Sequence, residues 1–225
     1  RTFFISMLGL YMNSLHIGLK QGNLDNNIFL LLLDEMKCLA DIFQTTIDTS
    51  DALAMQIAEE YVESNEFVFC GSGPNYASAL FCSAKILEAC GDNAIGQDIE
   101  EWAHSYYFAR KSDTPTFIIT AGGRDSSRVK EVATAAKRIG RRVVGIAPKS
   151  KEYLVPNANY YFPVNDSVKE LFWPLLGTIA GALFAAHRAR LIKEDIFRGF
   201  KGGREISENG GICRIYNSDQ WKNLQ

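Results

Sequence analysis

The sequence predicts an α/β fold: a three-layer, doubly wound parallel sheet with helices on both faces, preceded by helices. Short apolar runs stop at glycines, as in "FVFCGSG" (67–73) and "TPTFIITAGG" (114–123). Each run is followed by a segment with helical periodicity, and long helical segments come before the first run. Strands that alternate with helices and end in glycine loops are typical of a parallel sheet covered on both faces.

The first third of the chain is predicted to be helical. Residues 2–20 and 26–47 have apolar residues at helical spacing, and a further helix is expected over 49–64, capped by Thr49 or Ser50. Polar side chains interrupt the first helix, which falls short of the roughly 20 clean apolar residues of a membrane span. We therefore expect no membrane partner.

The remainder predicts strands and helices in turn. Strands are expected in the two runs above, in "RRVVGIAP" and in "YYFPV". Helices are expected in "NYASALFCSAKILEAC", which stops at Gly91, in "DSSRVKEVATAAKRIG", capped by Asp125 or Ser126, and in "VKELFWPLLGTIAGALFAAHRARL", kinked or started at Pro174. The glycine-rich tail is expected to lie on the surface.

Composition excludes several classes of protein. The net charge of −2 and the scattered basic residues give no reason to expect a nucleic-acid partner. The cysteines are odd in number and show no zinc spacing, so free thiols in a reducing, cytoplasmic environment are expected. The chain begins without Met, almost inside its first helix, and an upstream portion is expected.

Two loops are candidate ligand sites, because ligands of such sheets lie beyond the carboxyl ends of the strands. The first loop offers backbone and hydroxyl groups at Gly71, Ser72, Gly73 and Ser78, and the second offers Thr120, Ser126 and Ser127. Both loops precede a helix, whose N-terminus favours an anion. A tight turn and an ordinary serine cap explain the same residues equally well.

One helix carries a charged pair within an apolar segment. Phe81, Lys85 and Glu88 fall on one face of the helix expected over 75–90, and a helix this apolar is expected to be mostly buried. A surface ion pair and a functional pair both remain open. His104 follows Glu100 and Glu101, either of which is spaced to orient its imidazole.

Together these residues resemble a SIS (sugar isomerase) domain, most closely the second half of the isomerase unit in the glutamine:fructose-6-phosphate amidotransferase family. The resemblance rests on "FCGSGPNYASALFCSAKILEACG" and "IEEWAHSYY". It places the family's helix lysine on Lys85, its proton-transferring glutamate on Glu88 and its ring-opening histidine on His104. It also implies a homodimer with a shared active site, a sugar phosphate ligand, and neither a metal nor an organic cofactor.

The resemblance has departures. Phe81 stands where the family has a glutamate, and "AHSY" replaces the family's K-H-G-P. The family's C-terminal lysine has no clear match, and Lys201 corresponds to it by position only. In the family, the phosphate is bound mainly by a loop of the first half. Here either an upstream half or "TAGGRDSS" (120–127) is expected to bind it.

The resemblance divides the chain into four parts: a closing helix of a preceding SIS half (1–22), connecting helices (23–64), a SIS domain (65–195) and a tail (196–225). It implies a phosphosugar isomerase, or a deglycase acting on an aminated ketose phosphate, working by ring opening and proton transfer between C1 and C2. The alternatives are a non-catalytic sugar-phosphate-binding regulatory module and a dimerisation half that completes another chain's site.

Overall fold

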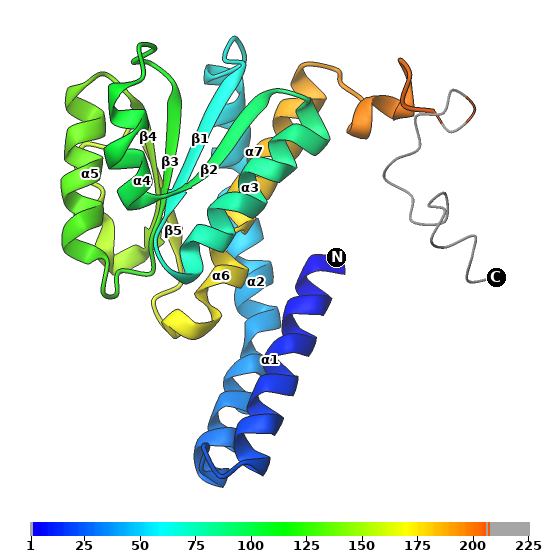
Figure 1. Ribbon diagram of the computed structural model, residues 1–225, viewed down its shortest axis with the longest axis vertical. Helices are drawn as coiled ribbons and strands as arrows, with labels where there is room; N and C mark the ends of the chain where they lie inside the picture. The colour runs from blue at the N-terminus through cyan, green and yellow to red at the C-terminus, as the bar shows by residue number, and fades with distance from the viewer. Residues whose placement is uncertain (1, 206, 208–225) are drawn as a thin grey trace.

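A single parallel sheet of five strands forms the centre of the molecule (Figure 1). The computed structural model describes residues 2–205 and 207, and it confirms the predicted α/β class. The strand order is β2-β1-β3-β4-β5. The strands are β1 (Glu66–Gly71), β2 (Asn93–Asp98), β3 (Pro115–Ile119), β4 (Arg142–Pro148) and β5 (Tyr160–Val164). The strand order reverses between β1 and β3, and such a switch point opens a crevice at the carboxyl ends of the strands.

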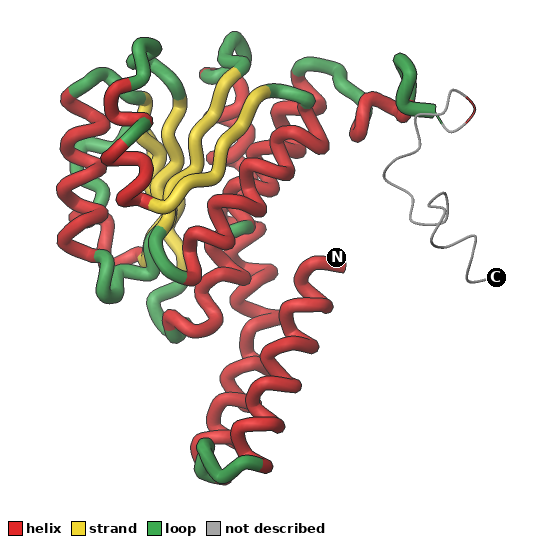
Figure 2. The backbone as a smooth tube through the Cα atoms, in the orientation of Figure 1, coloured by secondary structure: helices red, strands yellow, loops and turns green. Residues whose placement is uncertain are grey.

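Helices lie on both faces of this sheet, and a helical hairpin of α1 and the first half of α2 extends away from it (Figures 1 and 2). The α-helices are α1 (Thr2–Lys20), α2 (Asn26–Glu60), α3 (Pro74–Cys90), α4 (Ile99–His104), α5 (Ser126–Arg138), α6 (Trp173–Gly177) and α7 (Ile179–Leu191). The 3₁₀ turns are η1 (Tyr106–Phe108), η2 (Lys149–Leu154), η3 (Glu170–Phe172) and η4 (Ile196–Phe200).

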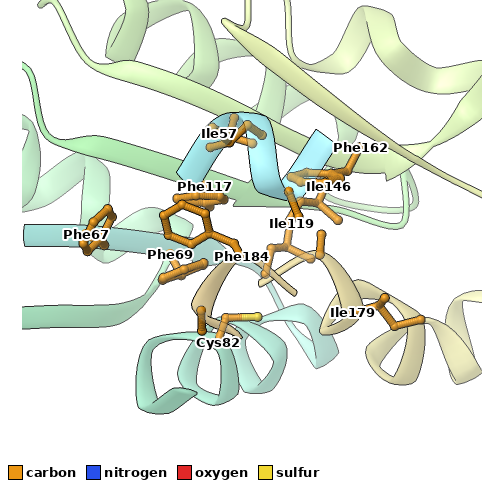
Figure 3. Packing of buried hydrophobic residues seen from close by; sticks show 14 of the residues in the cluster. Ile57, Phe67, Phe69, Cys82, Phe117, Ile119, Ile146, Phe162, Ile179 and Phe184 are labelled. Atoms are coloured by element: carbon orange, nitrogen blue, oxygen red, sulfur yellow. The ribbon is translucent and has the colours of Figure 1, made fainter. Parts of the chain in front are cut away.

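Alternate residues of the strands face different helices. In β1, Phe67 and Phe69 pack into a core shared with α2, α3 and α7 (Figure 3). Val68 and Cys70 point the other way, into a second core built with α4 and α5. Successive side chains of a strand point to opposite faces, so one buried strand serves both layers. Helices α3 and α4 therefore lie on opposite faces of the sheet.

The helix break expected near residue 49 is wrong, because α2 runs without interruption from Asn26 to Glu60. Its cap is Asp25, whose side chain accepts a hydrogen bond from the backbone N–H of Asn27 at 2.8 Å. The Thr49 hydroxyl instead donates to the Thr45 carbonyl at 2.8 Å. A threonine hydroxyl that bonds to a backbone carbonyl one turn earlier fits inside a helix. A residue type that favours helix caps therefore does not always mark the start of a helix.

The edge strand β2 was not predicted from the sequence. Its residues, "NAIGQD", contain few β-branched or aromatic side chains and are only partly buried. The strand forms by pairing with the buried β1, as in the register of Phe69 with Gly96. Helix α3 approaches so closely that a Cβ on Gly96 would lie 2.6 Å from the Leu80 Cα. Tertiary pairing outweighs the weak local propensity.

The apolar C-terminal segment divides at Pro174, as predicted, with α6 beginning one residue earlier and α7 following Thr178. By length and composition the stretch Glu170–Leu191 could cross a membrane, yet 67% of its apolar window is buried inside the fold. Phe184, for example, packs against Phe117 of the sheet at a ring distance of 5.0 Å. These side chains pack as those of a core helix do.

The described cysteines are all unpaired. Cys70, Cys82 and Cys90 are buried, whereas Cys38 is exposed on α2. Burial raises the pKa of the Cys82 thiol to about 12. Cys213 lies outside the described residues. The expectation of free thiols is therefore confirmed for the part of the chain that the structure describes.

Candidate functional site

Helix α3 brings the predicted charged pair together. Pro74 in its first turn pre-sets the helical φ, and Gly91 at φ 70° caps its end. Lys85 Nζ and Glu88 Oε2 form an ion pair. Lys85 Nζ also lies 5.1 Å from the centroid of the Phe81 ring, so Phe81, Lys85 and Glu88 share a face as predicted. Phe81 stacks in turn on Phe3 of α1, at a ring distance of 4.1 Å.

The pair is more accessible than the apolar sequence indicated. The side chains of Lys85 and Glu88 are 34% and 36% exposed, although other residues of α3, such as Cys82 and Ile86, are buried as expected. Two apolar side chains of the same helix, Leu80 and Leu87, are exposed as well. An ion pair within an apolar surface suits a ligand or partner that brings its own polar groups.

The structure does not bring His104 to Glu88. His104 is the last residue of α4 and is exposed, and α4 covers the face of the sheet opposite to α3. Of the two acids expected to orient it, Glu100 binds Arg128 through two contacts of 2.7 Å, and Glu101 makes no side-chain bond to His104 among the described residues. Within residues 2–205 and 207, no side chain forms a hydrogen bond or ion pair with His104.

The two glycine loops lie at the far end of α3 from Glu88. The helix starts at the carboxyl end of β1 and Glu88 is in its last turn, 14 residues later, so the axial separation is about 20 Å. A single sugar phosphate cannot span both places. The expectation that "TAGGRDSS" holds the phosphate of a substrate at Glu88 therefore does not fit a single copy of this fold.

The loops form a crevice at the switch point of the sheet. Gly71 lies so close to the start of α3 that a Cβ there would be 2.4 Å from the Asn75 carbonyl oxygen, and Gly73 has a φ of 53°. A cavity of about 370 Å³ opens beyond them. It is lined by Ser72, Gly73, Pro74, Arg124, Asp125 and Glu170.

Most of the predicted binding hydroxyls are already engaged. Ser78 is buried and donates to the Pro174 carbonyl at 3.3 Å. Thr120 donates to Asp125 Oδ1 at 3.0 Å, and Ser126 donates to the Gly123 carbonyl at 2.7 Å. Ser127 is exposed and does not line the cavity. Of the predicted residues, Ser72 and Gly73 line the cavity.

Two carboxylates in this crevice were missed as site residues. Asp125 was predicted only as a helix cap, yet its side chain makes no capping hydrogen bond. Glu170 comes from η3, far along the chain, and its carboxylate lies against Gly123. Burial and the charge of Glu170 raise the pKa of the Asp125 carboxyl. A sequence signal existed for Asp125, which lies two residues after the glycines of the β3 loop, but none pointed to Glu170.

The predicted tail lysine does not pair with Glu88. The Lys201 side chain is 74% exposed and pairs with Asp195 at 3.7 Å. The described residues contain no group of three or more His, Cys, Asp or Glu side chains that could hold a metal ion.

Comparisons with known proteins place these observations in a family context. No family model matches the chain. A glutamine–fructose-6-phosphate aminotransferase (isomerizing) from Gloeobacter violaceus is 25% identical over 189 residues, which cover 84% of this chain and 31% of that protein. The chain thus spans about a third of the length of this relative.

Solved structures match the fold. The C-terminal domain of glucosamine-fructose-6-phosphate aminotransferase from Francisella tularensis superposes with a TM-score of 0.76 at 16% identity, covering 81% of this chain and 51% of that one. An Escherichia coli chain, solved in complex with a sugar phosphate, has a TM-score of 0.59 at 16% identity, covering 76% of this chain and 94% of that one. The chain is therefore a sequence relative of the glutamine–fructose-6-phosphate aminotransferases and has the fold of the SIS domains.

Proposed function

We propose that the chain is a phosphosugar-isomerising module in which Glu88 moves a proton between C1 and C2 of a ketose phosphate or its aminated form. The observation that carries the proposal is the accessible Lys85–Glu88 ion pair on an apolar face of α3. A carboxylate beside a cation suits an enolisation, because the base takes a proton next to a carbonyl while negative charge develops on its oxygen. The relatives support the substrate class, since their name includes an isomerising step on fructose 6-phosphate and one structural neighbour was solved with a sugar phosphate.

Each group has a role in this proposal. Glu88 abstracts the proton from one carbon and returns it to the neighbouring carbon, while the hydroxyl proton passes to the former carbonyl oxygen, so that the carbonyl moves along the sugar without net oxidation. Lys85 stabilises the charge on the enediolate oxygen. His104 helps open the sugar ring. It lies on the other face of the sheet from Glu88, so it serves a site in a second copy of the chain, in a homodimer.

The test is turnover of fructose 6-phosphate, glucosamine 6-phosphate and glucose 6-phosphate by the wild type and by Glu88→Gln. Loss of a general base lowers the rate by about 10²–10⁴-fold, so the turnover of Glu88→Gln should be at least about 10²-fold lower than that of the wild type. The matched control is Glu131→Gln, which breaks the i,i+3 pair with Arg128 (2.8 Å) on the surface of α5. A Glu88→Gln variant that stays within about threefold of wild type rules out the assignment.

A second candidate is a sugar-phosphate-binding module without catalysis. It is favoured by one observation: within the described residues, Lys85 is the single side chain that pairs with Glu88, and the second catalytic group is not supplied by the same copy. Thermal unfolding separates the two candidates. A ligand that binds the native state raises Tm by mass action. The binding module is supported if fructose 6-phosphate raises the Tm of the wild type, Glu88→Gln abolishes this rise, and the wild type shows no turnover.

A further inference from the structure

We propose that Phe81 is a positioning residue that keeps the Lys85 ammonium in place while Glu88 gains and loses its proton, an inference that rests on the proposed isomerisation. Lys85 Nζ lies 5.1 Å from the centroid of the Phe81 ring. This is within the roughly 6 Å over which the face of an aromatic ring attracts a cation. The ring therefore gives the ammonium a second partner besides the carboxylate of Glu88.

The proton transfer itself creates the need for a second partner. While Glu88 is ionised, its charge attracts Lys85 and the two side chains form an ion pair. Once Glu88 has taken the proton of the substrate it is neutral, and this attraction is lost just when negative charge has developed on the substrate oxygen. The attraction between the ammonium and the ring does not depend on the charge of Glu88. Phe81 thus holds Lys85 in the state in which the enediolate requires its charge.

The Phe81 ring is itself held by helix α1. Phe3 of α1 lies 4.1 Å from Phe81 between ring centroids, with an angle of 31° between the ring planes. The next residue, Phe4, packs edge-on against Phe43 of α2 at 4.6 Å. These rings connect the first turn of α1 with the middle of α2 and of α3. Contacts between aromatic rings stabilise their packing, so the fold fixes the Phe81 ring before a substrate binds.

A second ion pair of the same spacing shows what the ring adds. Lys37 and Asp34 of α2 also lie three residues apart, but their side chains are 77% and 70% exposed. The cations that lie over an aromatic ring in the described part of the chain do not include Lys37. Holding two long, exposed side chains in one geometry costs conformational entropy. We therefore expect Lys37 to sample more orientations than Lys85.

Packing alone is the competing explanation for Phe81, which is partly buried against the main core. If Phe81 only packed, its replacement by leucine would lower stability without moving Lys85. Phe43 provides the matched control, because it is also partly buried against this core and belongs to the same group of rings. Its described ring contact is with Phe4 and not with Lys85.

The test is the NMR signal of Lys85 after reductive methylation of the full chain with ¹³C-formaldehyde, which keeps the charge of lysine. The signal is identified by its absence in Lys85→Arg. A methyl group over an aromatic ring resonates upfield, so the Lys85 signal should lie upfield of the Lys37 signal. It should stay there in Glu88→Gln, whose amide mimics the neutral acid, and in Phe43→Leu. Phe81→Leu should move it to the position of the Lys37 signal.

Turnover gives a second readout, measured with whichever of the three sugar phosphates the wild type converts. Phe81→Leu should lower kcat by about five- to thirtyfold, the rate equivalent of a partly buried contact between a cation and a ring. KM should stay within about twofold, because the contact matters after charge develops on the substrate. Phe81→Tyr keeps the ring and should retain kcat within about twofold, as should Phe43→Leu.

The possible outcomes separate this proposal from the proposed isomerisation. The proposal is overturned if the Lys85 signal stays upfield in Phe81→Leu, or if Glu88→Gln moves it to the position of the Lys37 signal. A higher KM with unchanged kcat in Phe81→Leu overturns it as well. These results leave the isomerisation intact. Absence of turnover in the wild type contradicts the isomerisation instead, and the NMR signal then still decides whether the ring holds the ammonium.

Discussion

Glu88 and Lys85 show what single residues can and cannot predict. Their spacing predicted a shared helix face, and the structure confirms it through the ion pair and the Lys85–Phe81 contact of 5.1 Å. Their exposure could not be predicted, because it depends on which side of α3 the sheet covers. The face towards the core is occupied by Cys82, Ile86 and other apolar residues of the same helix.

Asp125 and Asp166 should respond to pH with opposite signs. Burial raises the pKa of Asp125, so the folded state binds a proton more readily than the unfolded state. The resulting cost to stability appears as the pH rises above about 4. Asp125→Asn should therefore raise Tm at pH 7 by about 1–3 °C relative to wild type, and this gain should vanish near pH 3.

Asp166 is the matched control. It accepts hydrogen bonds from the backbone N–H and the hydroxyl of Ser150 at 2.9 and 2.7 Å, and these bonds lower its pKa. Its stabilisation is present above about pH 4 and is lost as the pH falls through its lowered pKa. Asp166→Asn should lower Tm at pH 7, and the difference should shrink on acidification. Equal pH profiles for both variants would contradict this account of the two side chains.

At the scale of elements, α3 connects the crevice with the ion pair, since one end forms the crevice and the other carries Glu88. Much of this arrangement was predictable. The glycine-ended runs predicted β1 and β3, and Gly91 predicted the end of α3. The edge strand β2 was not predictable from its own residues, because it is held by pairing with β1. The sequence also did not predict that α2 is uninterrupted, because packing decides whether a threonine caps a helix or bonds within it.

The start of α3 should tolerate no side chain at Gly71. A Cβ there would lie 2.4 Å from the Asn75 carbonyl oxygen and 2.6 Å from its carbonyl carbon, and these backbone atoms cannot move without displacing the helix. We expect Gly71→Ala to destabilise the fold by about 1–3 kcal/mol, as overpacking of a tight site does. Urea unfolding, with the slope of the transition checked against the wild type, measures the change.

Gly9→Ala is the matched control for that substitution. Gly9 lies inside α1, and a Cβ there would meet nothing within 4 Å. Alanine is favoured over glycine in a helix by about 1 kcal/mol, so this variant should be as stable as the wild type or more so. Destabilisation of similar size in both variants would show that the effect is not caused by the close approach of Asn75.

At the scale of the whole molecule, the sheet separates the proposed catalytic groups. Glu88 belongs to the layer of α3 and α7, and His104 to the layer of α4 and α5. The two residues are sixteen positions apart in the sequence. Nothing in the sequence indicated that they lie in different layers, because this depends on β2 passing between the two layers at the edge of the sheet. The resemblance implies a histidine from a neighbouring subunit, and the observed layering keeps Glu88 and His104 of one copy apart.

A mixture of two inactive variants should therefore recover activity. In a homodimer with shared sites, a dimer of one Glu88→Gln and one His104→Asn chain has one site with both substitutions and one site with neither. Random exchange makes about half of the dimers mixed, so about a quarter of the wild-type turnover should return, measured with whichever of the three sugar phosphates the wild type converts. Each variant alone, carried through the same unfolding and refolding, should remain inactive. Activity equal to the sum of the separate variants would contradict a site shared between two copies. Full activity of the His104→Asn variant alone would exclude His104 from the reaction at Glu88.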